Sequence, residues 1–384
     1  MRLNDYRGSR PQRRPARHAR RRYRRSPFLI SYWLGPITVI ENYLAHVKVA
    51  TEGLVSELLA FCDKPRSLAE VCAEFPGRQP RELREALQSM ERYALLESSP
   101  QGTDNRLKGW DSWSPGASFF HFSTKDANYA HGGADDFSGL RKLAAASPLP
   151  PRKKARPGAK RVHFASIEAR ATSEFVQVLE GRRTWREFSK KPMKREQLAE
   201  LLRLSFGVQG WARIPGVGRL PLKTSPSGGA LHPLEAYAAV RRVKGLAEGL
   251  YHYDAEGHGL ELVRARAGRQ ELESMLAGQS WFCDAAAVVF VTAVFTRAQW
   301  KYGNARAYRV VLAEAGHVCQ TFCLAATWLG LAPFCTMAFA DSKIEKALRV
   351  DGVNESVVYV MGVGTRPGRA ATAERLSQVT SRHP

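Results

Sequence analysis

One long apolar stretch constrains the fold of this 384-residue chain more than any other feature. Residues 305–329 contain no proline, and their charged side chains lie near the start, at Arg306, Arg309 and Glu314. Beyond Glu314 apolar and small residues fill every face, which is typical of a helix buried on all sides. About 25 residues at about 1.5 Å each span about 37 Å, roughly the width of a domain. Gly330 then supplies the left-handed residue that commonly ends a helix, so we predict a long central helix.

The segments around this helix alternate between helical and strand patterns, and the family resemblance described below implies an α+β fold for this part of the chain. The β-branched run over 285–294 predicts a strand buried on both faces. Further strands are predicted over 235–243, 249–253, 260–263 and 356–363. Shorter helices are predicted over 173–180, 194–206, 270–276 and 342–348.

A smaller unit is predicted ahead of these segments. Residues 27–50 are rich in aromatic and β-branched side chains, which favours strands. One helix follows, then a capping box from Ser67 to Glu70 opens a second, and Pro80 begins a third. A strand-like piece over 93–97 completes the outline of a winged helix. This pattern resembles the PqqD-like elements that bind leader peptides of ribosomally made natural products; a small helical domain that only packs against the rest of the chain is the alternative.

The net charge of +22 is concentrated in two segments. Residues 1–25 hold eleven arginines and one aspartate, and residues 151–161 hold six basic side chains. Like-charge blocks without apolar periodicity are usually tails or linkers, although an acidic peptide or nucleic acid could dock on them. We therefore divide the chain into a disordered basic tail (1–26), a winged-helix-like domain (27–100), an irregular connector with a basic linker (101–161), a larger α+β domain (162–370) and a C-terminal tail (371–384).

Cysteine usage and hydropathy favour a cytoplasmic protein without a membrane partner. Six cysteines in a chain of this length do not form a disulfide framework. No apolar core follows the basic N-terminus, as a signal peptide would require. Cys319 and Cys323 share a helix face near His317, but zinc sites want two pairs of ligands and Cys335 is isolated. We predict packing roles for these cysteines and no metal site.

Three short segments carry residues suited to a ligand. Gly181–Phe188 places three guanidinium groups and a hydroxyl within five residues, and arginine suits phosphate, with a solvated turn as the alternative. Thr224–Glu235 is a glycine-rich turn whose bare backbone could approach a flat ligand, or a plain loop. It lacks P-loop spacing, and a strand follows it where a dinucleotide fold needs a helix. Gly362–Arg366 offers backbone N–H groups and another cation.

Taken in order, these segments and the central helix resemble the SagB-type (ThcOx) flavin-dependent dehydrogenases of the nitroreductase superfamily, over about residues 163–368. The motifs are RRTWREF, SPSGGALHPLE, KYGNARAYR, EAGHVCQTFCLAATWLGL and YVMGVGTRP. The resemblance implies a mixed sheet flanked by helices around the long helix, and a homodimer with FMN at the subunit interface. The implied reaction oxidises thiazoline or oxazoline rings of a ribosomally made peptide to thiazoles or oxazoles.

The same resemblance implies roles for individual residues. Three arginines would hold the FMN phosphate and ribityl chain, the Ser-Gly-Gly turn would line the ring system, and the loop over 332–338 would bring backbone N–H groups near flavin N5. The implied cofactor-binding residues are Arg182, Arg183, Thr184, Arg186, Ser227, Gly228, Gly229, His232, Ala338 and Arg366.

Lys301 and Tyr302 match the Lys-Tyr pair of the azoline-oxidising members. Aromatising an azoline removes a proton from the α-carbon and a hydride from the β-carbon, so a base must stand beside the flavin. An ammonium group next to a phenol stabilises the phenolate, which suits such a base. The resemblance therefore implies catalytic roles for both, and which of them takes the proton stays open.

The implied partners are a precursor peptide with azoline rings, a second copy of the chain and a cyclodehydratase, with dioxygen as the final electron acceptor. Nucleic acid is not expected, because Arg81, Arg84 and Arg92 alternate with glutamates on the helix that would read it. Two alternatives remain. One is an NAD(P)H-dependent nitroreductase or flavin reductase acting on small molecules, and the other is a non-catalytic peptide- or nucleic-acid-binding protein.

Overall fold

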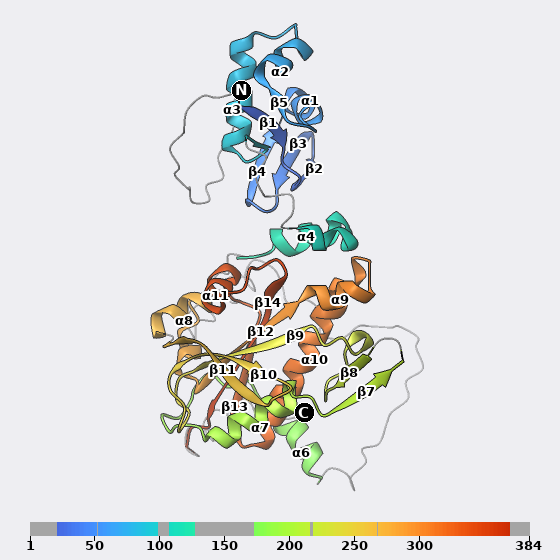
Figure 1. The fold of residues 1–384 in the computed structure, drawn as a ribbon. Coiled ribbons are helices and arrows are strands. Elements are labelled where there is room, and N and C mark those ends of the chain that lie inside the picture. The colour runs from blue at the N-terminus through green and yellow to red at the C-terminus, as the bar shows by residue number, and fades with distance from the viewer. Residues whose placement is uncertain are drawn as a thin grey trace, which may run out of the picture. The chain divides into compact units, whose positions relative to one another are not determined.

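The structure is a computed structural model that describes residues 21–51, 53–98, 107–126, 173–215, 218–266 and 268–368 (Figure 1). These residues form two compact units, which divide between Lys125 and Asp126. Residues 1–20 of the predicted basic tail, the basic segment over 151–161 and the predicted C-terminal tail lie outside the described residues.

The first unit contains the three predicted helices. They are α1 (Gly53–Phe61), α2 (Leu68–Glu74) and α3 (Pro80–Arg92). Both capping-box hydrogen bonds form between Ser67 and Glu70, and Pro80 occupies the first turn of α3, as predicted. Leu58, Leu83 and Leu87 are fully buried at the centre of their shared core.

Two small sheets complete this core. Strands are confirmed over 27–50, where β2 (Leu29–Leu34), β3 (Ile37–Asn42) and β4 (Val47–Thr51) form an antiparallel meander. Strand β1 (Arg22–Arg25) pairs with β5 (Arg66–Ser67) and β6 (Leu96–Glu97). Residues 22–25 therefore belong to the folded unit rather than the tail, because Tyr23 is buried and Arg22 pairs with Glu70 at 3.1 Å. The winged-helix assignment stays a prediction.

The aromatic segment after this unit's sheets is helical, although its aromatic residues favour a short strand over 118–122. A 3-10 turn, η1 (Lys108–Trp113), leads directly into α4 (Ser114–Ser123). Pro115 stands in the first turn of α4, a favoured helix start. His121 stacks on Trp110 at 4.9 Å between ring centroids. The helix is favoured because it buries Ala117, His121 and Phe122 on one face.

The second unit is built on a six-stranded sheet in the order β11-β10-β9-β12-β14-β13. The strands are β9 (Leu234–Val240), β10 (Gly249–Asp254), β11 (Gly259–Ala265), β12 (Ala287–Val294), β13 (Leu331–Thr336) and β14 (Glu355–Thr365). The α+β class is confirmed, and β12 is buried along its length as predicted. The sheet differs from expectation in being antiparallel at every pairing between these strands rather than mixed. The short connections from β9 to β10 and from β10 to β11 permit only antiparallel pairing of those strands.

Helices cover this sheet, and a hairpin extends from it. The helices are α6 (Glu174–Gly181), α7 (Arg195–Phe206), α8 (Arg269–Met275), α9 (Phe295–Lys301), α10 (Arg306–Trp328) and α11 (Asp341–Leu348). Short 3-10 turns are η3 (Gly228–Ala230) and η4 (Ser280–Asp284). The hairpin consists of β7 (Gly210–Ile214) and β8 (Gly218–Leu222).

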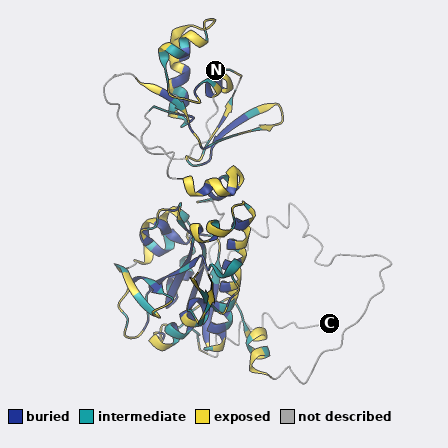
Figure 2. Ribbon diagram, turned by 45° about the vertical axis from the view of Figure 1, so that its right-hand side comes forward, coloured by how far each residue is buried: buried dark blue, intermediate teal, exposed yellow. Residues whose placement is uncertain are grey.

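Helix α10 is the predicted central helix, and it ends at Gly330 with a φ of +72°, as expected. Its inner face packs on the sheet, where Val311 and Phe322 are buried (Figure 2). It is not buried on all sides: Val310 is 41% exposed and Trp328 is 48% exposed. By length and mean hydropathy α10 could cross a membrane, but half of that window is buried inside the unit, as in a core helix.

Candidate functional site

The Lys-Tyr pair lies in the turn between α9 and α10. Lys301 is the last residue of α9, and Tyr302 follows it, with its N–H donating to the Ala298 carbonyl at 3.0 Å. The pair therefore precedes the central helix rather than beginning it. Lys301 belongs to the separate short helix α9, whose buried residues Phe295 and Ala298 anchor it to the unit. The Lys301 Nζ atom lies 5.4 Å from the centre of the Tyr302 ring.

The glycine-rich segment folds directly against this pair. A Cβ atom on Gly229 would lie 2.7 Å from Lys301 Nζ and 3.0 Å from the Tyr302 hydroxyl, and Gly229 has a φ of +69°. A Cβ atom on Gly228 would lie 2.9 Å from Val310 Cγ1 on α10. Both positions therefore require glycine, one for its conformation and both for the close approach of the backbone.

A buried polar cluster of His232 and Glu314 contacts the glycine-rich turn at Ser227 and Gly228. The His232 N–H donates to Ser227 Oγ at 2.9 Å. Hydrogen bonds from the Ser227 hydroxyl and the Gly228 N–H favour the Glu314 carboxylate, but burial outweighs them and raises the pKa of Glu314 to about 7. Burial, assisted by Lys223, lowers the pKa of His232 to about 4. The 3.9 Å separation of His232 and Glu314 is therefore not an ion pair at neutral pH.

Glu314 is a residue whose role sequence reasoning missed. Its carboxyl group faces a cavity of about 10 Å³ that Lys223, Ser225 and His232 also line, which is room for about one water molecule. The available signal was a lone carboxylate on a helix that is otherwise apolar beyond its first turns. We assign Glu314 the role of positioning the Ser227–Gly229 turn.

Glu314→Gln should remove a pH dependence of stability. The ordinary pKa of 4.5 rises to about 7 in the folded protein, so the folded state keeps a proton that the unfolded chain releases between these values. The stability carried by this proton is present below about pH 4.5 and is lost as the pH rises through about 7. In denaturant titrations, the free energy of unfolding of the variant minus that of wild type should rise by roughly 3 kcal/mol between about pH 5 and pH 8, because only the wild type loses stability over this range. The exposed Glu196→Gln should show no such gain, and an equal gain in both would refute the assignment.

The predicted phosphate-binding arginines gather at the opposite end of α10. Arg366 donates from Nε to the Leu331 carbonyl at 2.9 Å and from Nη2 to the Thr327 carbonyl at 3.1 Å. Its guanidinium lies 5.6 Å from the centre of the Trp185 ring. The Trp185 N–H donates to the Pro333 carbonyl at 3.0 Å, which ties the Arg182–Arg186 segment to β13.

The other members of this group flank Trp185 in the sequence. Arg183 donates to the carbonyls of Glu180 and Arg182, and Arg186 lies 5.4 Å from the centre of the Trp281 ring. Thr184 is exposed between them. Among the described residues no carboxylate lies within ion-pair distance of Arg182, Arg183, Arg186 or Arg366.

The two glycines before Arg366 have a packing role that the sequence interpretation did not foresee. A Cβ atom on Gly362 would lie 2.0 Å from the Phe334 ring, and one on Gly364 would lie 2.4 Å from the Phe188 ring. These glycines therefore make room for aromatic rings in the core rather than for a phosphate.

The predicted loop over 332–338 is mostly strand, since β13 extends to Thr336. Ala338 follows it, and its N–H donates to Thr336 Oγ1 at 3.0 Å. Its carbonyl accepts from Gln279 Nε2 at 2.7 Å. The Ala338 N–H is thus already engaged within the chain.

The structure brings the predicted residues together as two groups. The Lys-Tyr group comprises Ser227, Gly228, Gly229, His232, Lys301 and Tyr302. The arginine group comprises Arg182, Arg183, Thr184, Arg186 and Arg366. The first packs against Val310 and Glu314, and the second against Thr327. Because about 13 residues at about 1.5 Å separate these contacts, the groups lie about 20 Å apart along α10. Figure 1 shows α9 at one end of α10 and α6 at the other.

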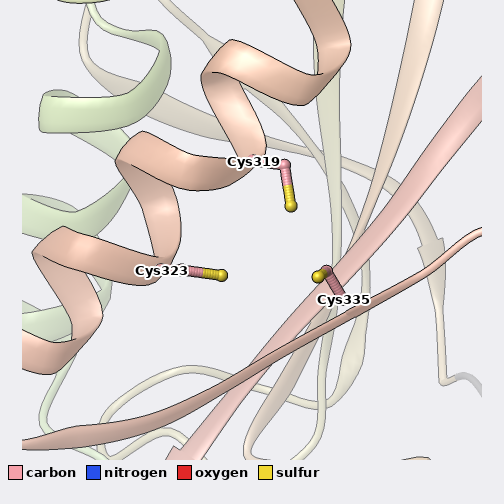
Figure 3. Close-up of side chains that lie close together, drawn as sticks. All are labelled: Cys319, Cys323 and Cys335. Atoms are coloured by element: carbon pink, nitrogen blue, oxygen red, sulfur yellow. The ribbon is translucent and has the colours of Figure 1, made fainter. Parts of the chain in front are cut away.

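Three cysteines also meet in this unit (Figure 3). Cys335 on β13 lies beside Cys319 and Cys323 on α10, with all three Sγ atoms within 4.8 Å of one another. The expectation that Cys335 is isolated is therefore wrong. The turn at Gly330 sends β13 back along α10, which sequence spacing did not reveal.

Comparisons with known proteins agree with this fold. The family described as "Nitroreductase family" matches residues 179–365. A Methanocaldococcus jannaschii protein named as a candidate nitroreductase, MJ1384, is 33% identical over 189 residues, which cover 49% of this chain and 89% of that protein. The trifolitoxin-processing protein TfxB of Rhizobium leguminosarum bv. trifolii is 33% identical over 141 residues, 35% of this chain and 38% of TfxB.

A solved structure, the E. coli microcin synthetase McbBCD complex with truncated pro-MccB17 bound, is 22% identical with a TM-score of 0.48, over 70% of this chain and 100% of that chain. This likeness is too distant to bear on function. The family match and the extent of similarity to MJ1384 rest on the unit that carries both residue groups. On this evidence the chain belongs to the nitroreductase family and is an oxidoreductase of that family.

Proposed function

We propose that this chain is a SagB-type, FMN-dependent dehydrogenase that oxidises thiazoline or oxazoline rings in a ribosomally made peptide. One observation carries the proposal: a lysine and a tyrosine are held against bare glycine backbone in a nitroreductase-family chain. The similarity to TfxB, a protein named for processing trifolitoxin, supports a peptide as substrate. Because this chain spans 38% of TfxB, that support concerns the matched part alone.

The two residue groups fit the two ends of FMN, which the nitroreductase family typically binds. In the described ranges the arginine group has no carboxylate partner, so its charge is available to a phosphate dianion. Gly228 and Gly229 carry no side chains of their own, so a flat ring system could approach their backbone beside Lys301 and Tyr302. Arg182, Arg183, Thr184, Arg186 and Arg366 would hold the phosphate and ribityl chain, and Ser227, Gly228 and Gly229 would line the ring.

A homodimer reconciles these fits with the separation of the groups. About 20 Å lies between the groups in one chain, which is a long span for one cofactor. The outer face of α10 carries the exposed side chains of Val310 and Trp328. A second copy packed there in the opposite direction would set the arginine group of one protomer beside the Lys-Tyr group of the other.

The chemistry assigned to the chain is proton removal. Bound FMN supplies a hydride acceptor for the β-carbon of the azoline ring. Lys301 or Tyr302 takes the proton from the α-carbon, and the other residue orients or stabilises it. The products are the aromatic azole, one proton and one hydride equivalent, which dioxygen finally accepts. The backbone of Gly228 and Gly229 keeps the pair in place.

We also propose partners and a cellular setting for this chain. The first unit would recognise the precursor peptide as a winged-helix-like element, and a cyclodehydratase would supply the azoline. The protein would act in the cytoplasm, without a membrane or nucleic-acid partner. Residues 101–161 would connect the winged-helix-like domain to the catalytic domain.

A small-molecule nitroreductase is the second candidate, because MJ1384 is named as a candidate for that activity. Flavin content and reductant preference separate the candidates. The purified protein should be yellow, with an absorbance band at about 450 nm from bound FMN. In anaerobic stopped flow, an azoline peptide should bleach this band, and NADH should not. Bleaching by NADH alone would favour the small-molecule activity, and a colourless protein that takes up no FMN would refute both.

A further inference from the structure

Three thiol groups from two elements converge in the interior of the second unit (Figure 3). Cys319 and Cys323 lie one turn apart on the same face of α10, and Cys335 projects toward them from β13. Their Sγ atoms all lie within 4.8 Å of one another. The proposed reaction does not use these thiols.

We propose that Cys319, Cys323 and Cys335 bind one Cu(I) ion. Thiolate sulfur is a soft ligand that selects Cu(I) or Zn(II) over the harder divalent cations. Zn(II) in structural sites takes four ligands in a tetrahedron. In the part of the chain that the structure describes, no fourth histidine, cysteine or carboxylate shares this cluster. Three thiolates without a fourth donor suit a three-coordinate Cu(I) ion.

The spacing of the sulfur atoms suits one metal ion. Three thiolates at about 2.3 Å from a shared ion lie about 4 Å from one another. The sulfur atoms need to close by less than about 1 Å from their 4.8 Å limit, which small side-chain rotations can supply. An iron–sulfur cluster is typically held by four cysteine thiolates, and the described residues place three here.

The surroundings offset the negative charge of the site. Cu(I) and three thiols give a complex of charge −2 and three released protons, with no change in oxidation state. The Tyr359 hydroxyl lies in hydrogen-bonding reach of Cys335, and the Arg182 guanidinium lies near enough to act electrostatically on Cys323 and Cys335. Such outer partners tune and stabilise metal sites.

Access to the site comes through Cys335. Cys319 and Cys323 are each 4% exposed, whereas Cys335 is only half-buried at the end of β13. A donor of Cu(I) could therefore meet Cys335 first. Once bound, the ion would fix β13 to α10 beside Arg182, close to the arginine group.

Anaerobic competition for Cu(I) tests the site in the full-length protein. The protein is first reduced and freed of metal, then titrated with Cu(I) against a chromophoric Cu(I) chelator. We expect one Cu(I) per chain. Cys319→Ala, Cys323→Ala and Cys335→Ala should each raise the Kd by at least about 100-fold, since loss of an outer partner alone costs about 10–100-fold.

Cys283→Ala is the matched control, because Cys283 is also buried in this unit but lies outside the cluster. It should keep the wild-type Kd, and thermal melts confirm that each variant is folded. Equal loss in Cys283→Ala, or wild-type binding by Cys335→Ala, would overturn the site. Preference for Zn(II) over Cu(I) would overturn the metal assignment. A disulfide in the purified protein, with no Cu(I) uptake after reduction, would overturn both.

Discussion

Lys301→Ala and Tyr302→Phe should leave FMN bound while the rate of azoline oxidation falls by about 10²–10⁴-fold. A positioned acid or base contributes a factor of this size to proton transfer. Neither side chain belongs to the arginine group, so flavin content should match that of wild type. The measurement is turnover of a thiazoline peptide by mass spectrometry, with flavin absorbance read on the same samples. Loss of FMN in either variant would contradict a purely catalytic role.

Mixing Lys301→Ala with a second variant, Arg366→Ala, tests whether the Lys-Tyr pair and the arginine group that serve one flavin come from different protomers. Lys301→Ala chains mixed with Arg366→Ala chains form some dimers with one lesion in each protomer. If the flavin is held by the arginine group of one chain and faces Lys301 of the other, one site in each such dimer is intact and activity returns. If activity does not return, the arginine group and Lys301 that serve one flavin belong to the same chain.

Gly229→Ala should reduce turnover by about 100-fold although it removes no group that reacts. Its new methyl group would lie 2.7 Å from Lys301 Nζ and 3.0 Å from the Tyr302 hydroxyl, so the pair must move. A displacement of about 1 Å can cost about 10² in rate. The left-handed φ of +69° adds about 1 kcal/mol of strain, which a thermal melt would register separately.

Two other glycines provide matched controls for this variant. Gly303→Ala adds a methyl group next to Tyr302 where nothing lies within 4 Å, so turnover should be unchanged. Gly245→Ala introduces strain at a φ of +77°, again without contact, so it should lower stability and spare activity. If Gly245→Ala lost as much activity as Gly229→Ala, strain rather than displacement of the pair would explain the loss.

The parts of the fold that sequence reasoning recovered are those with strong local signals. The unbroken apolar run and Gly330 located α10, and the capping box at Ser67 located α2. Strand β13, which contains Pro333, was missed because the resemblance implied a loop over 332–338. The structure places β13 at the edge of the sheet, where proline is tolerated since one side of the strand makes no ladder hydrogen bonds.

The candidate site required contacts between distant segments. Periodicity could not show that Gly229 meets Lys301, 72 residues later, and the resemblance to a family implied only that both lie near the flavin. Nor could it place Glu314 beneath the glycine-rich turn or Cys335 beside α10. Each of these contacts depends on how α10, β13 and the turn after β8 pack, and that is a tertiary property.

Mass spectrometry of a peptide that carries one thiazoline tests the central claim most directly. Incubated in air with the flavin-loaded wild-type protein and no nicotinamide, the peptide should lose two hydrogen atoms, about 2 Da, as the ring becomes a thiazole. Lys301→Ala with full flavin content should leave the mass unchanged over the same time. An unchanged mass with the wild-type protein, together with rapid oxidation of NADH by the same sample, would contradict the proposed dehydrogenase.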